Sequence, residues 1–167
     1  MKWRNRLNLE PENKHSLSEL EDLEILNEIP SASKGITVLP ESYREVDGLI
    51  VKADAGDFTK WVKLNAPEIE ITANEGHSKL ALRSGDYWLP LVFLASDVSL
   101  PIYLNVVSNY LYEKMRGALR GDKARVHLSA VYEDKKEGKL KRFDFEGDAE
   151  SLRSAIKKFD LNKFMDE

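Results

Sequence analysis

The sequence contains no cysteine among its 167 residues, which excludes disulfide bonds, thiolate metal sites and a cysteine nucleophile. Its three histidines are far apart and show none of the spacings of a zinc or calcium motif. Phosphate-binding glycine loops and the G-x-S-x-G serine elbow are also absent. We therefore expect no metal and no cofactor, and we favour a binding protein over an enzyme.

Long uninterrupted apolar runs are absent too. The most apolar stretch, residues 89–121, is interrupted by Asp97, Asn105, Asn109 and two prolines. A charged residue in the middle of a membrane span costs at least ~2.5 kcal/mol. The first residues lack the apolar run of a signal peptide. We therefore expect a soluble, cytoplasmic protein without membrane contact.

The composition, with 42% hydrophobic and 32% charged residues, is typical of a globular protein with a core. We expect an N-terminal polar segment with one helix over residues 1–34 and a single α+β domain over residues 35–167. Ser16 and Glu19 have the spacing of a helix capping box, which predicts a helix that ends before Pro30.

The centre of the domain is predicted to be a buried strand followed by a long helix. Residues 88–95 form a short apolar run of strand length. Ser99 is a suitable N-cap and Pro101 suits a first helical turn, so the helix is predicted to run from there to Arg120, before Gly121.

Alternating apolar and polar residues predict strands on both sides of this unit. The alternation over residues 68–72 and 80–83, with a turn between them, indicates one hairpin, and residues 126–132 and 140–146 indicate a second. Asp148 is a suitable cap for a C-terminal helix. The expected fold is α+β, with an antiparallel sheet of six to seven strands and two hairpins packed on the central and C-terminal helices.

Candidate catalytic residues are few. His127 shares the polar face of a predicted strand with Ser129, and Asp54 is one of several acids near the strand predicted over residues 48–53. Each is a weak candidate, because a surface role explains either residue equally well.

A polar stripe runs along the predicted central helix, with successive members four, three, four and four residues apart. Polar groups that are enclosed on a helix need hydrogen-bond partners, and they can fix a subunit pairing or line a pocket. The candidate ligand- or partner-binding residues are Asn105, Asn109, Tyr112, Arg116 and Arg120.

The net charge of −4 hides an asymmetry along the chain. Residues 35–99 carry six basic and ten acidic side chains, whereas residues 100–167 carry fourteen basic and twelve acidic ones. The acidic segment 35–99 argues against a protein that binds nucleic acids over its whole surface. A nucleic-acid or phosphate-bearing partner remains an alternative, because one segment carries a cluster of basic residues. These residues are Lys114, Arg116, Arg120, Lys123 and Arg125.

Three hypotheses of function follow. The first is a non-catalytic protein-interaction or regulatory module that binds a protein partner or forms a homodimer. The second is a hydrolase- or nuclease-like enzyme that acts on a phosphate-bearing substrate through the basic cluster. The third is a sensor domain for a small ligand.

Overall fold

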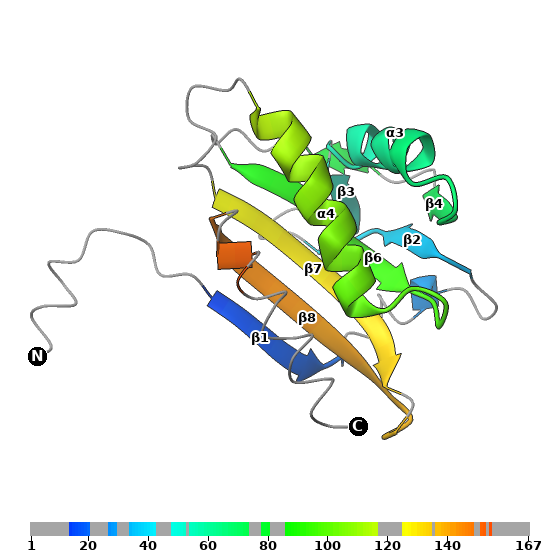
Figure 1. Ribbon diagram of the computed structural model, residues 1–167. Helices are drawn as coiled ribbons and strands as arrows, with labels where there is room; N and C mark the ends of the chain where they lie inside the picture. Colours follow the sequence, from blue (N-terminus) through cyan, green and yellow to red (C-terminus); the bar gives the residue numbers. More distant parts are fainter. Residues whose placement is uncertain are drawn as a thin grey trace, which may run out of the picture.

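The computed structural model describes residues 14–20, 27–29, 34–42, 48–52, 54–73, 78–80, 86–116, 125–134, 136–148, 151–152 and 154. The described chain is an α+β structure in which two helices lie against a large sheet (Figure 1). Six strands form this sheet in the spatial order β1 (Lys14–Glu19), β8 (Lys139–Asp148), β7 (Arg125–Asp134), β6 (Tyr87–Leu94), β2 (Ile36–Leu39) and β4 (Ile71–Ala73).

The sheet is mixed, so the predicted antiparallel sheet is wrong. Strand β6 runs parallel to β7, and β2 runs parallel to β4, while the other neighbouring pairs are antiparallel. A separate two-stranded sheet, β3 (Ile50–Lys52) with β5 (Ser78–Leu80), is also parallel. The hairpin predicted around residues 74–78 does not form, because β4 and β5 belong to different sheets.

The helices explain this error. Parallel neighbours need a long crossover, usually a helix. Helix α4 (Leu100–Met115) supplies the crossover from β6 to β7. Helix α3 (Ala55–Asn65) lies in the ambiguous segment after β3 and separates β2 and β3 from their parallel partners β4 and β5. Once α3 is a helix, the connections are long enough for parallel pairing.

The start of the central helix is confirmed in detail. Ser99 caps α4, since its side chain accepts a hydrogen bond from the Ile102 amide at 3.3 Å, and Pro101 lies in the first turn. Arg116 is the C-terminal cap residue of α4. Residues 117–120, where the helix was predicted to continue, lie outside the described residues.

The predicted buried strand is also confirmed as β6, which lies between β7 and β2 in the sheet. Pro90 has no amide proton to donate to a ladder. The pairing of β6 with β7 shifts register between Trp88 and Leu91, so the proline falls in an irregularity of the ladder. Such a bulge is where an interior strand tolerates proline.

The N-terminal helix predicted from Ser16 is wrong, because Lys14–Glu19 forms strand β1 at one edge of the sheet. It pairs antiparallel with β8, Leu17 opposite Phe143. Long-range pairing overrides the local capping signal here, as tertiary context commonly does for propensities. The predicted helix residues 21–26 lie outside the described residues, and the proposed boundary after residue 34 stays a prediction.

The second predicted hairpin, β7 with β8, is confirmed. Its ten-residue strands are antiparallel, and Gly138 closes the turn by donating to the Asp134 carbonyl at 2.8 Å. The Asp148 carboxylate accepts from the Ser151 amide at 2.7 Å, as a helix cap would, but the elements of the described chain end with β8 and do not include the predicted C-terminal helix. Residues 155–167 of the predicted C-terminal helix lie outside the described residues.

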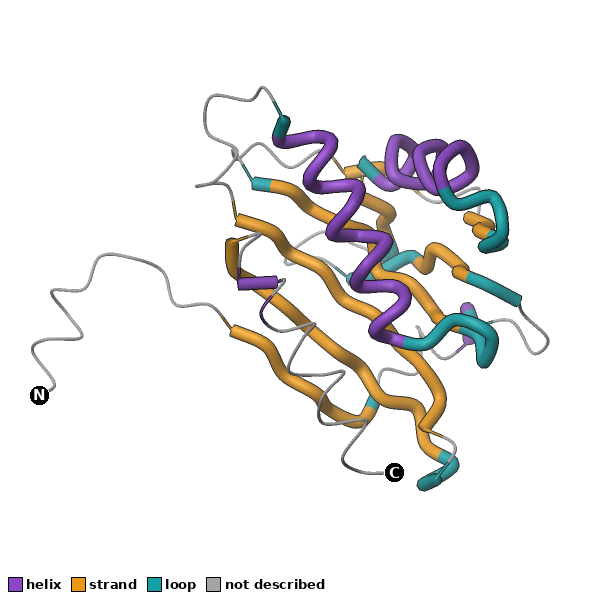
Figure 2. The backbone as a smooth tube through the Cα atoms, in the orientation of Figure 1, coloured by secondary structure: helices purple, strands orange, loops and turns teal. Residues whose placement is uncertain are grey.

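The main core lies between the sheet and the two helices; α4 runs along one face of the sheet, and α3 packs against α4 and β4 (Figure 2). Alternate residues of β7 and β8 enter this core, for example Val126, Leu128 and Phe143. Their neighbours in sequence must therefore point to the opposite face. A smaller apolar cluster on the sheet consists of Leu20, Leu39, Leu91, Phe93 and Val131.

Two tyrosines of α4 face α3 with different partners. The Tyr110 hydroxyl donates to the Asp57 carboxylate at 2.7 Å, whereas the buried Tyr103 hydroxyl has no hydrogen-bond partner among the described residues. Burial raises the pKa of Tyr103, and burial together with the Asp57 bond raises the pKa of Tyr110. The Lys114 ammonium and the Tyr110 hydroxyl, both hydrogen-bonded to Asp57, lower the pKa of that carboxyl group.

Alkaline pH is therefore expected to destabilise the fold. Both folded-state pKa values exceed that of an unfolded tyrosine. The contribution of the neutral phenols to folding stability is therefore fully present below pH ~10 and is lost as the pH rises above it. At pH 11 each tyrosine should lower the free energy of unfolding by about 1.4 kcal/mol. Urea titrations from pH 8 to 11 measure the loss.

Tyr103→Phe is the matched variant for this titration. At pH 7 it should change stability little, because the hydroxyl has no hydrogen-bond partner among the described residues. At pH 11 it should remove the share of the alkaline loss that Tyr103 contributes, about 1.4 kcal/mol. An alkaline loss of the same size in the variant and the parent would show that Tyr103 does not contribute.

Candidate functional site

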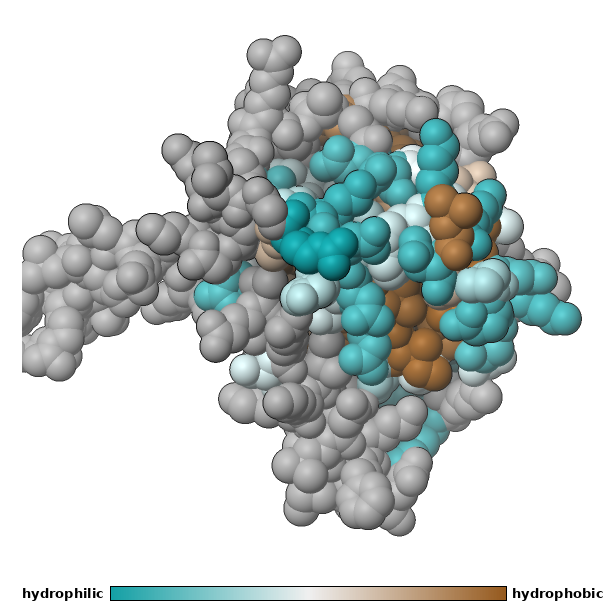
Figure 3. Space-filling view, turned by 45° about the horizontal axis from the view of Figure 1, so that its top comes forward, coloured by the Kyte–Doolittle hydropathy of each residue, from teal (hydrophilic) through white to brown (hydrophobic). Residues whose placement is uncertain are grey.

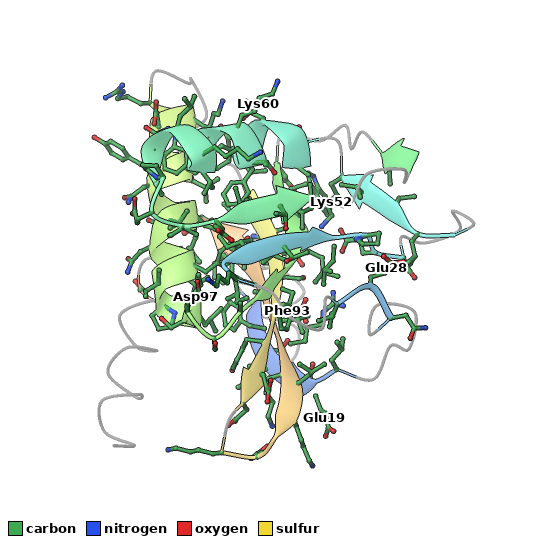
Figure 4. The ribbon with its side chains drawn as sticks, turned by 90° about the vertical axis from the view of Figure 1, so that its right-hand side faces the viewer. Glu19, Glu28, Lys52, Lys60, Phe93 and Asp97 are labelled. Atoms are coloured by element: carbon green, nitrogen blue, oxygen red, sulfur yellow. The ribbon has the colours of Figure 1, made fainter. Side chains whose placement is uncertain are left out.

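The face of the sheet opposite α4 carries a pocket of about 270 Å³. Strands β1, β6, β7 and β8 form its floor, and residues in and beside β3 complete the wall. In Figure 4, which views the sheet from its side, α4 lies on one side of the sheet and Lys52 points toward the other. We call this hollow the sheet pocket; it is lined by Ser16, Glu41, Lys52, Trp88, His127, Leu128, Ser129, Arg142, Asp144, Phe145 and Glu146.

His127 lies in the sheet pocket with two close neighbours. Its Nε2 atom is 2.9 Å from the Asp86 carboxylate, and its ring stacks on Trp88 with centroids 3.8 Å apart and planes inclined by 3°. The other ring nitrogen, Nδ1, lies 3.9 Å from Glu146, which is beyond hydrogen-bond distance. Asp86 and Trp88 thus fix the orientation of the imidazole.

A second cluster lies one pleat along the strands, where Ser129 is opposite Asp144. The Ser129 hydroxyl donates to Asp144 Oδ1 at 2.5 Å, and Arg142 Nε lies 3.0 and 3.2 Å from the two oxygens of that carboxylate. Arg142 Nη2 also donates to the Ser129 oxygen at 3.4 Å. The three side chains form a closed polar network on the pocket floor.

A buried ion pair forms the wall of the pocket. Lys52 Nζ lies 3.0 Å from Glu41, and the two side chains are only 8% and 9% exposed. The ammonium also donates to the Leu89 carbonyl at 3.2 Å and lies 5.5 Å from the centre of the Trp88 ring. Removing one member of such a pair leaves an uncompensated buried charge, so both are needed to keep the wall intact.

The contacts of Ser129 in the sheet pocket are not those of a serine nucleophile. A catalytic serine needs a base within hydrogen-bond reach. Ser129 instead donates to a carboxylate that Arg142 neutralises, while His127 is engaged with Asp86. Within the described part of the chain, no group of three or more histidine or acidic side chains is placed to hold a metal ion.

The two weak catalytic candidates lie apart. His127 is in the sheet pocket, whereas Asp54 is the exposed residue at the N-terminus of α3, where its side chain makes no capping hydrogen bond. Sequence reasoning missed most of the pocket, including Asp144 and Lys52, and it missed Asp86, the partner of His127. The alternation of β7 and β8 placed His127 and Ser129 on a polar face, but their partners come from strands that are distant in sequence.

The polar stripe lies on the outside of α4, away from the sheet pocket. Asn105, Asn109, Tyr112 and Arg116 are all exposed, and Ile102 continues the line toward the N-terminus of the helix. We call these five residues the outer stripe. Arg120 lies outside the described residues.

Two of the described residues of the basic cluster pair with acids in different parts of the fold. Lys114 pairs with Asp57 at 2.8 Å between the helices, whereas Arg125 pairs with Glu146 at 3.6 Å, beside the sheet pocket. Arg120 and Lys123 lie outside the described residues. Lys114 and Arg125 are therefore each paired with an acid at a different place in the fold.

Comparisons of the chain with protein-family models, with curated proteins and with solved structures find no match. No similarity assigns a function. Among the described residues, no helix has the length and apolarity that a membrane crossing requires. The function therefore has to be inferred from the pocket and the exposed faces.

Proposed function

We propose that this chain is a non-catalytic regulatory domain that binds a small polar ligand in the sheet pocket. The convergence of charged side chains from several strands on one hollow supports this function. Concave sites with a few converging polar groups are the usual places of ligand binding. The volume of about 270 Å³ is at the small end for ligand sites, so amino-acid-sized compounds are the first ligands to test.

The charges favour a ligand that carries both signs. The pocket is lined by two basic side chains, Lys52 and Arg142, and by three acidic ones, Glu41, Asp144 and Glu146. Each of these charges already has an opposite charge within 4 Å, so an ion of one sign would disturb the balance. A zwitterion leaves the balance intact.

Two groups at the pocket offer complementary contacts to such a ligand. Arg142 uses Nε and Nη2 in its bonds to Asp144 and Ser129, and a guanidinium has further N–H groups to donate to a carboxylate. The half-exposed Glu146 can accept from an ammonium group. The stacked rings of Trp88 and His127 line the pocket as well.

Free amino acids and dipeptides are the probes for this function. At a concentration of about one hundred times Kd, a ligand stabilises the folded state by about 2.7 kcal/mol. For a chain of this length, such a gain corresponds to a rise in Tm of roughly 5–10 °C. Thermal unfolding with each compound at 10 mM, followed by calorimetric titration of the hits, measures it.

Arg142→Gln and Glu146→Gln are the test variants, and Lys63→Gln on the exposed side of α3 is the matched control. We expect each pocket variant to weaken binding at least tenfold and the control to leave it unchanged. A panel without any rise in Tm, or a rise that persists in both pocket variants, contradicts the proposal. Turnover of a bound compound would instead indicate an enzyme.

A further inference from the structure

The outer stripe of α4 has the spacing of a helix-packing seam. Ile102, Asn105, Asn109 and Tyr112 follow one another at intervals of three, four and three residues. This alternation of three and four keeps side chains on one line of a helix and is the spacing with which paired helices interlock. Ile102 is 46% exposed and Tyr112 is 58% exposed, so the line lies on the surface.

The stripe is complementary to itself when it is reversed. Ile102 and Tyr112 lie five residues on either side of Val107, and Asn105 and Asn109 lie two residues on either side of it. In a two-fold interface, residue i contacts j of the other copy and j contacts i. An antiparallel pairing centred at the level of Val107 therefore places Ile102 against Tyr112 and Asn105 against Asn109, each twice.

The charges at the two ends of α4 match the same arrangement. Arg116 is exposed at the C-terminal end, and Asp97 is exposed just before the N-terminal cap, where it lies beside the base of α4 (Figure 4). In the antiparallel pairing each Arg116 approaches Asp97 of the other copy. A parallel pairing would place like charges side by side, which is unfavourable.

We propose that α4 docks antiparallel against α4 of a second copy of this chain. The inference goes beyond the proposed ligand binding, because the outer stripe and the sheet pocket are on opposite faces of the sheet. Figure 3 shows apolar surface between polar groups on the helix-bearing side of the molecule. A helix of sixteen residues is about 24 Å long, so the contact is small and the dimer is of modest affinity.

Sedimentation equilibrium between 10 and 500 µM tests this dimer. We expect the parent chain to associate within that range. Ile102→Glu introduces two charges into the contact and should weaken association at least tenfold. Leu64→Glu is the matched control, because Leu64 is an apolar residue of α3 that is 81% exposed and lies outside the stripe. Circular dichroism verifies that both variants fold.

Cross-linking determines the direction of the helices, and the absence of native cysteine gives it a clean background. Ile102→Cys and Tyr112→Cys are made separately and oxidised alone or as a mixture. Ten residues of helix, about 15 Å, separate equivalent positions along the axis of an antiparallel pair. We therefore expect disulfide-linked dimers only in the mixture.

Other outcomes overturn the proposal. A parent chain that stays monomeric at 500 µM rejects the dimer. A dimer that persists in the Ile102→Glu variant would show that the interface lies outside the outer stripe. Disulfides formed by either single variant alone reveal parallel helices, which contradict the proposed geometry.

Discussion

Gly35→Ala is expected to lower the free energy of unfolding by at least ~3 kcal/mol. Gly35 has a φ of +71°, and a side chain there would place its Cβ 2.0 Å from the carbonyl oxygen of Glu70. A residue other than glycine costs about 1–2 kcal/mol in this conformation, and overpacking against backbone adds about 1–3 kcal/mol. Chemical denaturation at pH 7 measures the loss.

The contact cannot relax cheaply because Gly35 lies where three segments meet. The next residue, Ile36, donates to the Glu70 carbonyl at 2.8 Å, and the Gly35 carbonyl accepts from Ala95 at 2.9 Å. The Gly35 amide donates to the Asp97 carboxylate at 2.9 Å. Moving the backbone away from Glu70 would therefore disturb bonds on both sides of β2.

Gly138→Ala is the matched control. Gly138 has a φ of +65°, but a Cβ there would meet no atom within 4 Å. This variant reports the cost of the backbone conformation alone, about 1–2 kcal/mol. Equal losses in the two variants would show that the approach of Glu70 contributes nothing.

Local signals in the sequence predicted the central elements of the fold. Ser99 and Pro101 located the start of α4, and the alternation of β7 and β8 predicted their hairpin, because caps and hairpins depend on neighbouring residues. Parallel pairing depends on contacts between distant residues, such as Ile36 with Ile71. No local pattern reports such a contact, so the direction of the strands was predicted incorrectly.

The candidate site was less predictable than the fold for the same reason. His127 could be singled out, but its partners Asp86 and Trp88 precede it by about forty residues and meet it only because β6 runs parallel to β7. The outer stripe was predictable, because a helix places residues three and four apart on one line. Sequence reasoning could not show whether that line was covered.

The two proposed binding surfaces can operate together. The sheet pocket and the outer stripe lie on opposite sides of the sheet, and the main core lies between the sheet and the helices. Strand β6 contributes Trp88 to the pocket and leads directly into α4 through the Ser99 cap. A ligand in the pocket therefore does not compete for space with a second copy on α4.

Phe58→Ala is expected to cost about 3–5 kcal/mol of folding free energy, the range for a fully buried phenylalanine. Phe58 has no exposed surface and joins α3 to α4. Its ring makes edge-on contacts with Tyr103 and Tyr110, with centroids 6.2 and 5.1 Å apart. Such aromatic pairs contribute about 0.5–1.5 kcal/mol beyond the burial of area. Urea denaturation measures the total.

Phe93→Ala provides the comparison on the opposite face, because Phe93 belongs to the smaller apolar cluster and is slightly exposed. Its cost should be smaller, since the surroundings of a partly open site can relax or admit water. A double-mutant cycle of Phe58→Ala with Tyr110→Phe then tests whether the loss of the Phe58 ring also weakens the Tyr110–Asp57 hydrogen bond. If the losses of folding free energy in the two single variants add up in the double variant, packing between α3 and α4 does not support this bond. A coupling energy of at least ~0.5 kcal/mol would show that one cooperative contact holds the two helices together.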